Sequence, residues 1–412
     1  MKLLFLSPCI PSPNGTGWEQ RAFHFLKAYS ELFDITFVCC NFSGKSPTLE
    51  QREFLHLLCS QVSIFEYSSV ILNNGSIKKL LRCFGDRPFF ASASFDSNFS
   101  NTVIKSAEKA DLIHVSRLEL FSLVSSDFYS QKTILDLDEC HFTLLNRRKN
   151  YHFSRNFKVK LEKILRGLDS FRIKYYQANA VRKSRVTFVS SETEKSRIAA
   201  SKQIVVVPNA AKLLLTIPKV KKSFPKQILF VGNLSAPANI DAVMFFVEKI
   251  FSEIIARDSD CEFHIVGRQP SPEIIALTKH DKIKLTIDLP NLEEAYLNAT
   301  IVVIPIRFGA GTKLKMLEAF GFGVPCVSTS IGCEGLSIRD KEHLLIADTP
   351  EEFAAASMRL LGNLDLQQKI ADSAWRYVHQ YHRPENIINN IVELFLSDVK
   401  SCKKTSITDD KF

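Results

Sequence analysis

Short apolar runs alternate along this chain with longer stretches in which apolar residues recur at helical spacing. The runs are rich in β-branched and aromatic residues and end at turn residues, which predicts thirteen β-strands. The first seven are Lys2–Pro8, Asp34–Cys40, Val62–Tyr67, Leu112–Val115, Lys132–Asp138, Val186–Ser190 and Ile204–Pro208. The other six are Gln227–Gly232, Cys261–Gly267, Ile283–Asp288, Ile301–Ile306, Pro325–Thr329 and His343–Ala347. Continuous apolar strands that alternate with helices predict parallel sheets covered on both faces.

The strands form two series, because thirteen exceed what one open sheet usually holds. Between the series, Lys212–Lys226 contains five lysines, two prolines and no acidic residue, as expected of an exposed linker. We therefore predict an α/β protein of two doubly wound, Rossmann-like domains. The predicted domains are 1–209 and 227–380, with a linker at 210–226 and a flexible polar tail at 401–412.

Composition places the chain among globular proteins, since 45% of its 412 residues are hydrophobic and 24% are charged. No apolar run approaches the length of a membrane-spanning helix, and the apolar N-terminal run is too short for a secretion signal. The ten cysteines show no Cys-x-x-Cys spacing and several lie inside apolar runs. We expect reduced core cysteines in a cytoplasmic protein.

The net charge of +9 is concentrated in one segment. Residues 147–185 hold 13 lysines and arginines but two acidic residues, so the rest of the chain sums to −2. Apolar and aromatic residues are interspersed there. A basic amphipathic helix of this kind can lie on an anionic membrane, and the alternative is a core-packed helix with a solvated basic face.

A glycine loop follows the predicted strand Ile301–Ile306 and leads into a helix from about Thr312. Glycines let a ligand approach the backbone, and a helix N-terminus suits phosphate. Lys313 and Lys315 add charge, although they need not face the same way. Glu318 lies about two turns into the helix and is placed to reach ligand hydroxyls. The alternative is an ordinary strand–loop–helix connection.

The first predicted strand also ends in a glycine-containing loop, with Gly15 and Gly17, and Arg21 follows one turn later. In open parallel sheets, ligands bind where the strands end. Two later strands end near Ser116, Arg117 and Asp138, which we expect at the same edge of the sheet as Gly15. Acidic residues cluster at 136–139, but we expect no metal and no other cofactor.

The second half of the chain resembles the C-terminal domain of family 4 glycosyltransferases, which have the GT-B fold. The matching segments are Phe230–Leu234, Ile265–Gly267, Ala299–Pro305, Gly311–Ala319, Gly323–Pro325 and Ser328–Gly335. The resemblance is strong over 225–400 and weak over 1–210. It implies transfer of a sugar from a nucleotide-sugar donor, usually with retention of configuration and without metal. It also implies that a helix at 381–400 crosses back to the first domain.

The resemblance assigns roles to individual residues. Glu318 matches the glutamate that holds the donor ribose, and Gly311 and Thr312 match the loop that meets the diphosphate and sugar. The full donor set is Gly232, Asn233, Gly267, Arg268, Gly309, Ala310, Gly311, Thr312, Lys313 and Glu318. The catalytic candidates are Lys313, Arg21 and Gly17. The resemblance also implies that the first domain is the acceptor side, with Gly15, Ser116, Arg117 and Asp138 as candidates.

Two departures from the family pattern concern the donor. Ala310 stands where many members have a second glutamate, and Asn233 and Ala238 stand where many have arginine and lysine. A branch with the Gly-x-Gly-Thr-Lys/Arg-Leu-Lys loop shares these departures. We infer that Lys313 supplies the missing charge.

The expected acceptor is a glycan or a lipid-linked molecule, with an anionic membrane surface as a partner of 147–185 and no nucleic acid. The alternatives are a nucleotide-sugar epimerase of the same fold, a basic nucleic-acid-binding protein, and an inactive protein that binds the donor.

Overall fold

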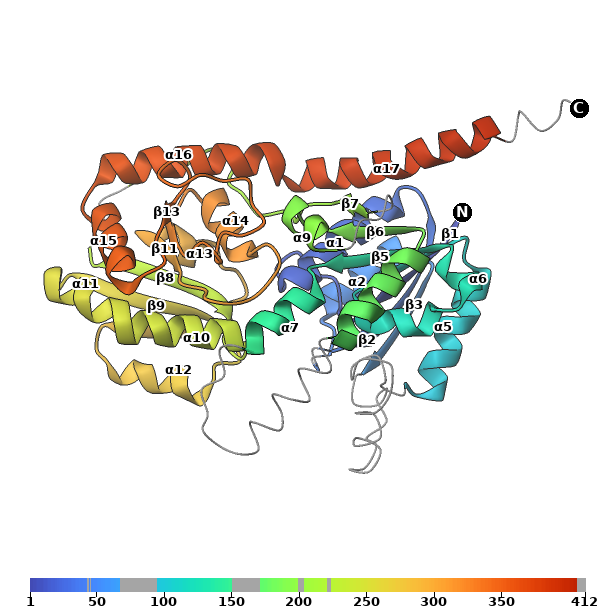
Figure 1. Cartoon of the computed structure of the whole chain (residues 1–412), viewed down its shortest axis with the longest axis horizontal. Coiled ribbons are helices and arrows are strands. Elements are labelled where there is room, and N and C mark those ends of the chain that lie inside the picture. Colours follow the sequence, from blue (N-terminus) through green and yellow to red (C-terminus); the bar gives the residue numbers. More distant parts are fainter. Residues whose placement is uncertain are drawn as a thin grey trace, which may run out of the picture. The chain divides into compact units, whose positions relative to one another are not determined.

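The computed structural model describes residues 1–66 except 43 and 45, and residues 95–149, 171–198, 204–220 and 224–405. The chain divides into two compact units. Unit 1 comprises Met1–Pro208 and Glu385–Phe412, and unit 2 comprises Asn209–Pro384 (Figure 1).

Unit 1 is built on a seven-stranded parallel sheet with the strand order β3-β2-β1-β4-β5-β6-β7. The strands are β1 Lys2–Ser7, β2 Asp34–Asn41, β3 Gln61–Glu66, β4 Leu112–Ser116, β5 Thr133–Asp138, β6 Val186–Val189 and β7 Ile204–Val206. Because the order reverses between β1 and β4, the ends of these two strands form a switch point at which doubly wound folds bind ligands.

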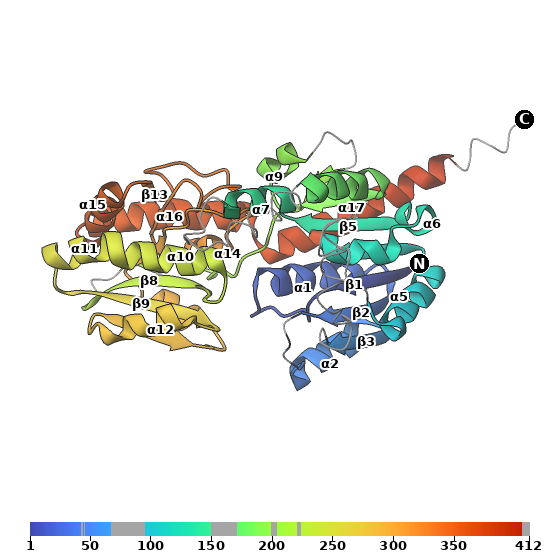
Figure 2. The ribbon, with the colours of Figure 1, turned by 60° about the horizontal axis from the view of Figure 1, so that its bottom comes forward.

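Helices connect the strands of unit 1. They are α1 Gly17–Ser30, α2 Leu49–Leu58, α5 Ser97–Lys109, η1 Leu118–Val124, α6 Asp127–Ser130, α7 His141–Lys149, a helix over residues 171–183, and α9 Glu192–Arg197. Helices α1 and α2 pack beside one another along β2 and β3 (Figure 2).

An aromatic cluster joins the sheet of unit 1 to the C-terminal helix α17, Pro384–Thr405. The Phe5 ring stacks on His114 at 4.4 Å, and the Phe395 ring of α17 meets Tyr29 edge-on at 5.4 Å. Tyr29 Oη and His114 Nδ1 are hydrogen-bonded at 2.9 Å. Burial lowers the pKa of His114 to about 3, so it is a neutral histidine of the core. These contacts place α17 on unit 1.

Unit 2 is built on a six-stranded parallel sheet with the strand order β10-β9-β8-β11-β12-β13. The strands are β8 Lys226–Asn233, β9 Cys261–Arg268, β10 Ile283–Ile287, β11 Ile301–Ile304, β12 Cys326–Ser328 and β13 Leu345–Ile346. The helices are α10 Pro237–Phe246, η2 Val247–Phe251, α11 Ser252–Arg257, α12 Pro272–Ala276, η3 Leu277–Lys279, α13 Glu293–Leu297, α14 Leu314–Gly321, α15 Pro350–Leu361 and α16 Leu364–Tyr381. As in unit 1, the sheet order reverses beside the first strand, here between β8 and β11.

The predicted linker is in part a packed element of unit 2. The Leu214 N–H donates to the Gly321 carbonyl at 3.0 Å, and Trp375 Nε1 donates to the Leu214 carbonyl at 3.2 Å. A Cβ on Gly321 would lie 2.1 Å from the Lys212 carbonyl oxygen, so the segment lies directly against α14. Lysines suggested exposure, but the apolar residues between them and the backbone hydrogen bonds attach this segment to unit 2.

Within the described parts of the chain, no helix is both long enough and apolar enough to cross a membrane.

Candidate functional site

The carboxyl ends of β8 and β9 meet at two glycines. Gly232 pairs with Gly267 in the parallel register, and Asn233 pairs with Arg268 one residue further on. A Cβ on Gly267 would lie 1.9 Å from the Gly232 carbonyl oxygen, so no other residue fits there without moving a strand. These four predicted donor residues therefore lie together at one edge of the sheet.

The loop after β11 contains two glycines in conformations that favour glycine. Gly309 has φ 142° and Gly311 has φ 69°. Lys313 Nζ donates to the Ala310 carbonyl at 2.7 Å and to the Gly311 carbonyl at 2.6 Å. The Lys313 ammonium thus closes the loop on itself, and its expected contact with a diphosphate stays a prediction.

Two further side chains of this region are Thr312 and Lys315, and the expected contact of Thr312 with the donor stays a prediction. The Thr312 hydroxyl is buried and has no hydrogen-bond partner among the described residues. Lys315, which was expected to add charge at the loop but was not among the donor residues, reaches across to α10, where Nζ donates to Asn239 Oδ1 at 2.8 Å. Its Nζ also lies 4.0 Å from the centre of the Phe230 ring. The amino group of Lys315 therefore lies at the edge of the sheet beside Gly232.

Glu318 lies in the second turn of α14 and is 5% exposed. Its Oε2 accepts a hydrogen bond from the Tyr296 hydroxyl at 3.0 Å. Burial, and then the Glu318 carboxylate, raise the pKa of Tyr296 well above its usual value, so the phenol stays a donor. Tyr296 holds the carboxylate in place at the loop, and the ribose role of Glu318 stays a prediction.

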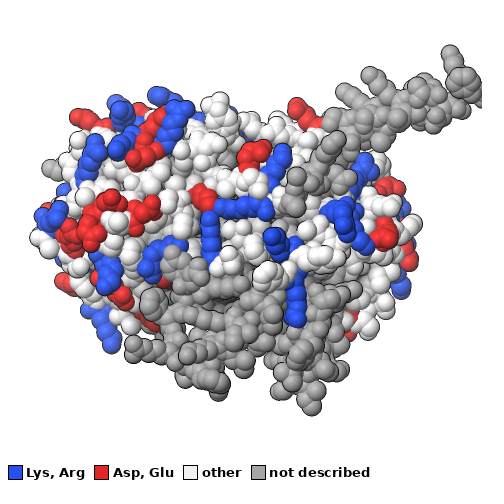
Figure 3. Space-filling model, in the orientation of Figure 1, with Lys and Arg blue, Asp and Glu red and all other residues white. Residues whose placement is uncertain are grey.

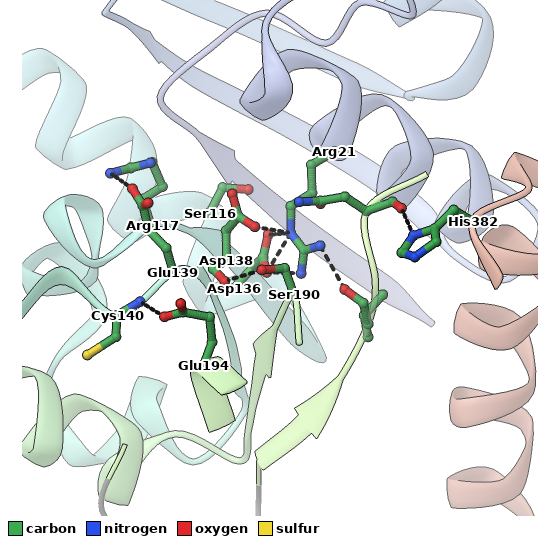
Figure 4. A network of polar contacts seen from close by, with 12 residues as sticks. Arg21, Ser116, Arg117, Asp136, Asp138, Glu139, Cys140, Ser190, Glu194 and His382 are labelled. Atoms are coloured by element: carbon green, nitrogen blue, oxygen red, sulfur yellow. Dashed lines mark hydrogen bonds and ion pairs between the residues drawn. The ribbon is translucent and has the colours of Figure 1, made fainter. Parts of the chain in front are cut away.

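Arg21, the expected catalytic arginine, is a buried structural residue of unit 1. It extends from α1 to the end of β5, where Nη2 and Nε lie 2.7 and 2.9 Å from the Asp136 carboxylate oxygens (Figure 4). Nη1 donates to the Val207 carbonyl at 2.8 Å. Burial opposes its charge, but the Asp136 and Asp138 carboxylates outweigh this and raise the pKa of Arg21. These partners hold the guanidinium at the end of β5, and the catalytic role of Arg21 stays a prediction.

The other predicted residues of unit 1 surround the switch point. Ser116 Oγ lies 3.1 Å from His114 Nε2, and the Arg117 guanidinium stacks on the Trp18 ring at 3.3 Å. Gly15 lies against Glu19, where a Cβ would overlap that side chain. A Cβ on Gly17 would meet nothing within 4 Å, so the packing gives no reason for glycine at that position.

Four of the five described non-glycine residues with positive φ lie where strands end. Arg117, Asp138, Gln269 and Asp288 have φ values of 75°, 57°, 51° and 55°, and they follow or end β4, β5, β9 and β10. Such conformations are strained and persist where the surroundings impose them, often at ligand sites. The strain marks the same edges of both sheets that the motifs mark.

The acidic cluster at 136–139 is occupied by protein partners rather than grouped for a metal. Asp136 is paired with Arg21, and Glu139 Oε1 lies 3.9 Å from Arg117 Nη2. Among the described residues, no group of three or more histidine, cysteine, aspartate or glutamate side chains is arranged to hold a metal ion.

On the face shown in Figure 3, acidic and basic side chains are intermixed over unit 2.

Two doubly wound units, with a glycine loop and a buried glutamate in the second, define the class of GT-B glycosyltransferase folds. Residues 225–363 match the family model described as Glycosyl transferases group 1. The resemblance inferred for the second half of the chain is thereby confirmed at the level of this group.

Known proteins resemble parts or all of the chain. An uncharacterized 44.6 kDa protein in the cps region of Klebsiella pneumoniae is 29% identical over 173 residues, which cover 40% of this chain and 44% of that protein. Glycosyltransferase 1 domain-containing protein 1 of Xenopus tropicalis is 22% identical over 143 residues, 33% of this chain and 41% of that protein. The chain thus aligns with less than half the length of these curated relatives.

A solved structure extends the likeness to nearly the whole chain. Anabaena HepE, crystallised in complex with UDP and glucose, matches with a TM-score of 0.64 and 14% identity. The match covers 96% of this chain and 100% of that one. At this identity the likeness establishes the fold, and the predicted GT-B architecture is confirmed.

Proposed function

We propose that this protein is a glycosyltransferase that takes its sugar from a nucleotide-sugar donor bound to unit 2. The observation that carries the proposal is the edge of the second sheet, where the Gly232–Gly267 approach, the glycine loop and Glu318 come together within the matched residues 225–363. The HepE structure, which contains UDP and glucose on the same fold, supports the choice of ligand.

The chemistry of donor cleavage fits the groups present. Breaking the bond between sugar and phosphate builds negative charge on the leaving diphosphate, and fixed donors aimed at that charge lower the barrier. The start of α14 and its lysines supply positive potential there. We propose retention of configuration without a metal, with the leaving phosphate helping to take the acceptor proton. His114 is buried in the core of unit 1 and is not a candidate base.

A panel of nucleotide-sugars tests this proposal. The panel contains UDP-, GDP-, dTDP- and ADP-linked sugars. We expect the sugars linked to one of these nucleotides to raise the melting temperature of the protein, because a ligand at about 100 times its Kd stabilises a fold by about 2.7 kcal/mol. Turnover with a glycan or lipid-linked acceptor then distinguishes a transferase from an epimerase, which converts the donor alone. Failure of every nucleotide-sugar to bind to the folded protein would contradict the proposal.

We also propose that the acceptor lies at a membrane surface that the protein contacts peripherally, on the cytoplasmic side. Residues 150–170 of the basic segment lie outside the described residues. In the helix over 171–183, Phe171 and Tyr175 are 76% and 73% exposed beside basic residues such as Arg172 and Lys174. Aromatic and basic side chains together favour an anionic lipid surface.

Liposome flotation tests the membrane contact. The protein should float with vesicles that contain phosphatidylserine, less so with neutral vesicles, and the F171S/Y175S variant should float several-fold less. Phe128, which is also exposed but lies outside the basic segment, provides the matched control F128S. Flotation that is independent of anionic lipid would reject the contact.

A further inference from the structure

The side chain of Lys315 ends beside the carboxyl end of β8. It leaves α14 in the first turn and reaches the first turn of α10, where Nζ donates to Asn239 Oδ1 at 2.8 Å. A Cβ on Gly232 would lie 3.0 Å from this Nζ. The ammonium therefore lies against the part of the sheet edge at which doubly wound folds bind their ligands.

This ammonium has donors to spare. Lysine carries three N–H groups, and Lys315 uses one of them in a hydrogen bond within the described residues. Its Nζ also lies over the Phe230 ring. None of the described carboxylates lies within ion-pair distance of it. Lys313, by contrast, donates to two loop carbonyls, so the two lysines have different tasks.

The position of Lys315 compensates for residues that the neighbouring loop lacks. Asn233 and Ala238 flank the turn between β8 and α10, where the resemblance to family 4 leads us to expect arginine and lysine. Asn239 Nδ2 donates to the Asn233 carbonyl at 2.8 Å, which turns Oδ1 toward Lys315. The turn thus contains no lysine or arginine of its own, and Asn239 binds the Lys315 amino group, which extends from α14.

We propose that Lys315, rather than Lys313, binds the diphosphate of the donor and takes up a proton as the diphosphate arrives. The inference rests on the proposed donor site in unit 2. A neutral amine would lose the attraction to the incoming diphosphate dianion. An ammonium with two unused N–H groups donates hydrogen bonds to two diphosphate oxygens, and the diphosphate in turn balances its positive charge.

The surroundings of Lys315 favour its neutral form before the ligand binds. Burial, and then the Lys313 ammonium, lower the pKa of Lys315 to about 7, and the Glu318 carboxylate opposes them. The charged groups on the packed elements β8 and α10 are already paired, Lys226 with Asp258 and Asp241 with Arg307. A bound diphosphate raises this pKa, so above pH 7 each binding event takes up one proton and the affinity falls up to tenfold per pH unit.

Calorimetry of the full chain with its nucleotide-sugar tests the inference, because a diphosphate diester does not itself titrate near neutral pH. At pH 8, binding in HEPES and in Tris should differ in heat by the amount expected for about one proton taken up. K315R, which is always charged, should bind without proton uptake. K315M should bind at least tenfold more weakly, also without uptake. K284M provides the control, because Lys284 is a surface lysine of unit 2 paired with Glu262, and it should behave like the wild type.

The outcomes separate this inference from the proposed function. Binding without proton uptake in the wild type, or unchanged uptake in K315M, would overturn the role of Lys315 and leave the donor site standing. NMR of ¹³C-labelled lysine provides an independent measurement on the free protein. It should show one lysine that titrates near pH 7 and that is absent from K315R, and a spectrum without such a lysine would overturn the inference.

Discussion

Replacing Arg21 by alanine should lower the free energy of unfolding of unit 1 by about 3–5 kcal/mol. The substitution leaves the Asp136 carboxylate buried without its bidentate partner and frees the Val207 carbonyl. Removing one partner of a buried ion pair is more costly than replacing both, because the remaining charge stays out of water. The double variant R21A/D136A should therefore be more stable than R21A alone.

The two tryptophans of the chain allow each unit to be followed separately. Trp18 lies in unit 1 and Trp375 in unit 2, so urea unfolding of the W375F and W18F proteins reports on one unit at a time. R21A should shift the Trp18 transition and leave the Trp375 transition unchanged. R182A is the matched control, since Arg182 lies on the surface and bonds to Asn179, three residues before it. A Trp18 transition that R21A does not shift would remove the ion pair as a support of unit 1.

Periodicity and β-branched composition were sufficient to predict the strands, because strands buried on both faces are continuous apolar runs. The predicted runs Asp34–Cys40 and Cys261–Gly267 are β2 and β9, each of which extends one residue further. The segment around Lys212 was predicted less well. Its lysines suggested solvent, yet hydrogen bonds to Gly321 and Trp375, more than a hundred residues away, attach it to unit 2. Long-range contacts of this kind leave no local signal.

The same distinction applies to the candidate site. The glycine loop and Glu318 were visible because a turn, a helix N-terminus and a carboxylate occur at short spacing. The roles of the cations were not visible. Lys313 precedes the helix and bonds to its own loop, whereas Lys315 is in the helix and reaches Asn239 on another element. Arg21 likewise pairs with Asp136, which is 115 residues away in the sequence and is brought near by the fold.

The Glu318→Ala variant should bind the nucleotide about 10- to 100-fold more weakly, because a hydrogen bond to a charged group contributes about 1.5–3 kcal/mol. The carboxylate is buried in the second turn of α14 and held by Tyr296, so it is oriented before any ligand arrives. A pre-oriented acceptor loses little entropy on binding, which is the reason to expect a value near the upper end.

A cycle that pairs this variant with deoxy-nucleotides tests whether the ribose is the group recognised. The nucleoside diphosphate that binds best should be compared with its 2′-deoxy and 3′-deoxy analogues by calorimetry. Loss of a hydroxyl should weaken binding to the wild type but weaken binding to E318A no further, since the partner is already gone. The Y296F variant keeps the Glu318 carboxylate and the aromatic ring that stacks on Phe322. It should therefore weaken nucleotide binding a few-fold at most. An equal deoxy penalty in wild type and E318A would show that Glu318 acts on the loop and not on the ribose.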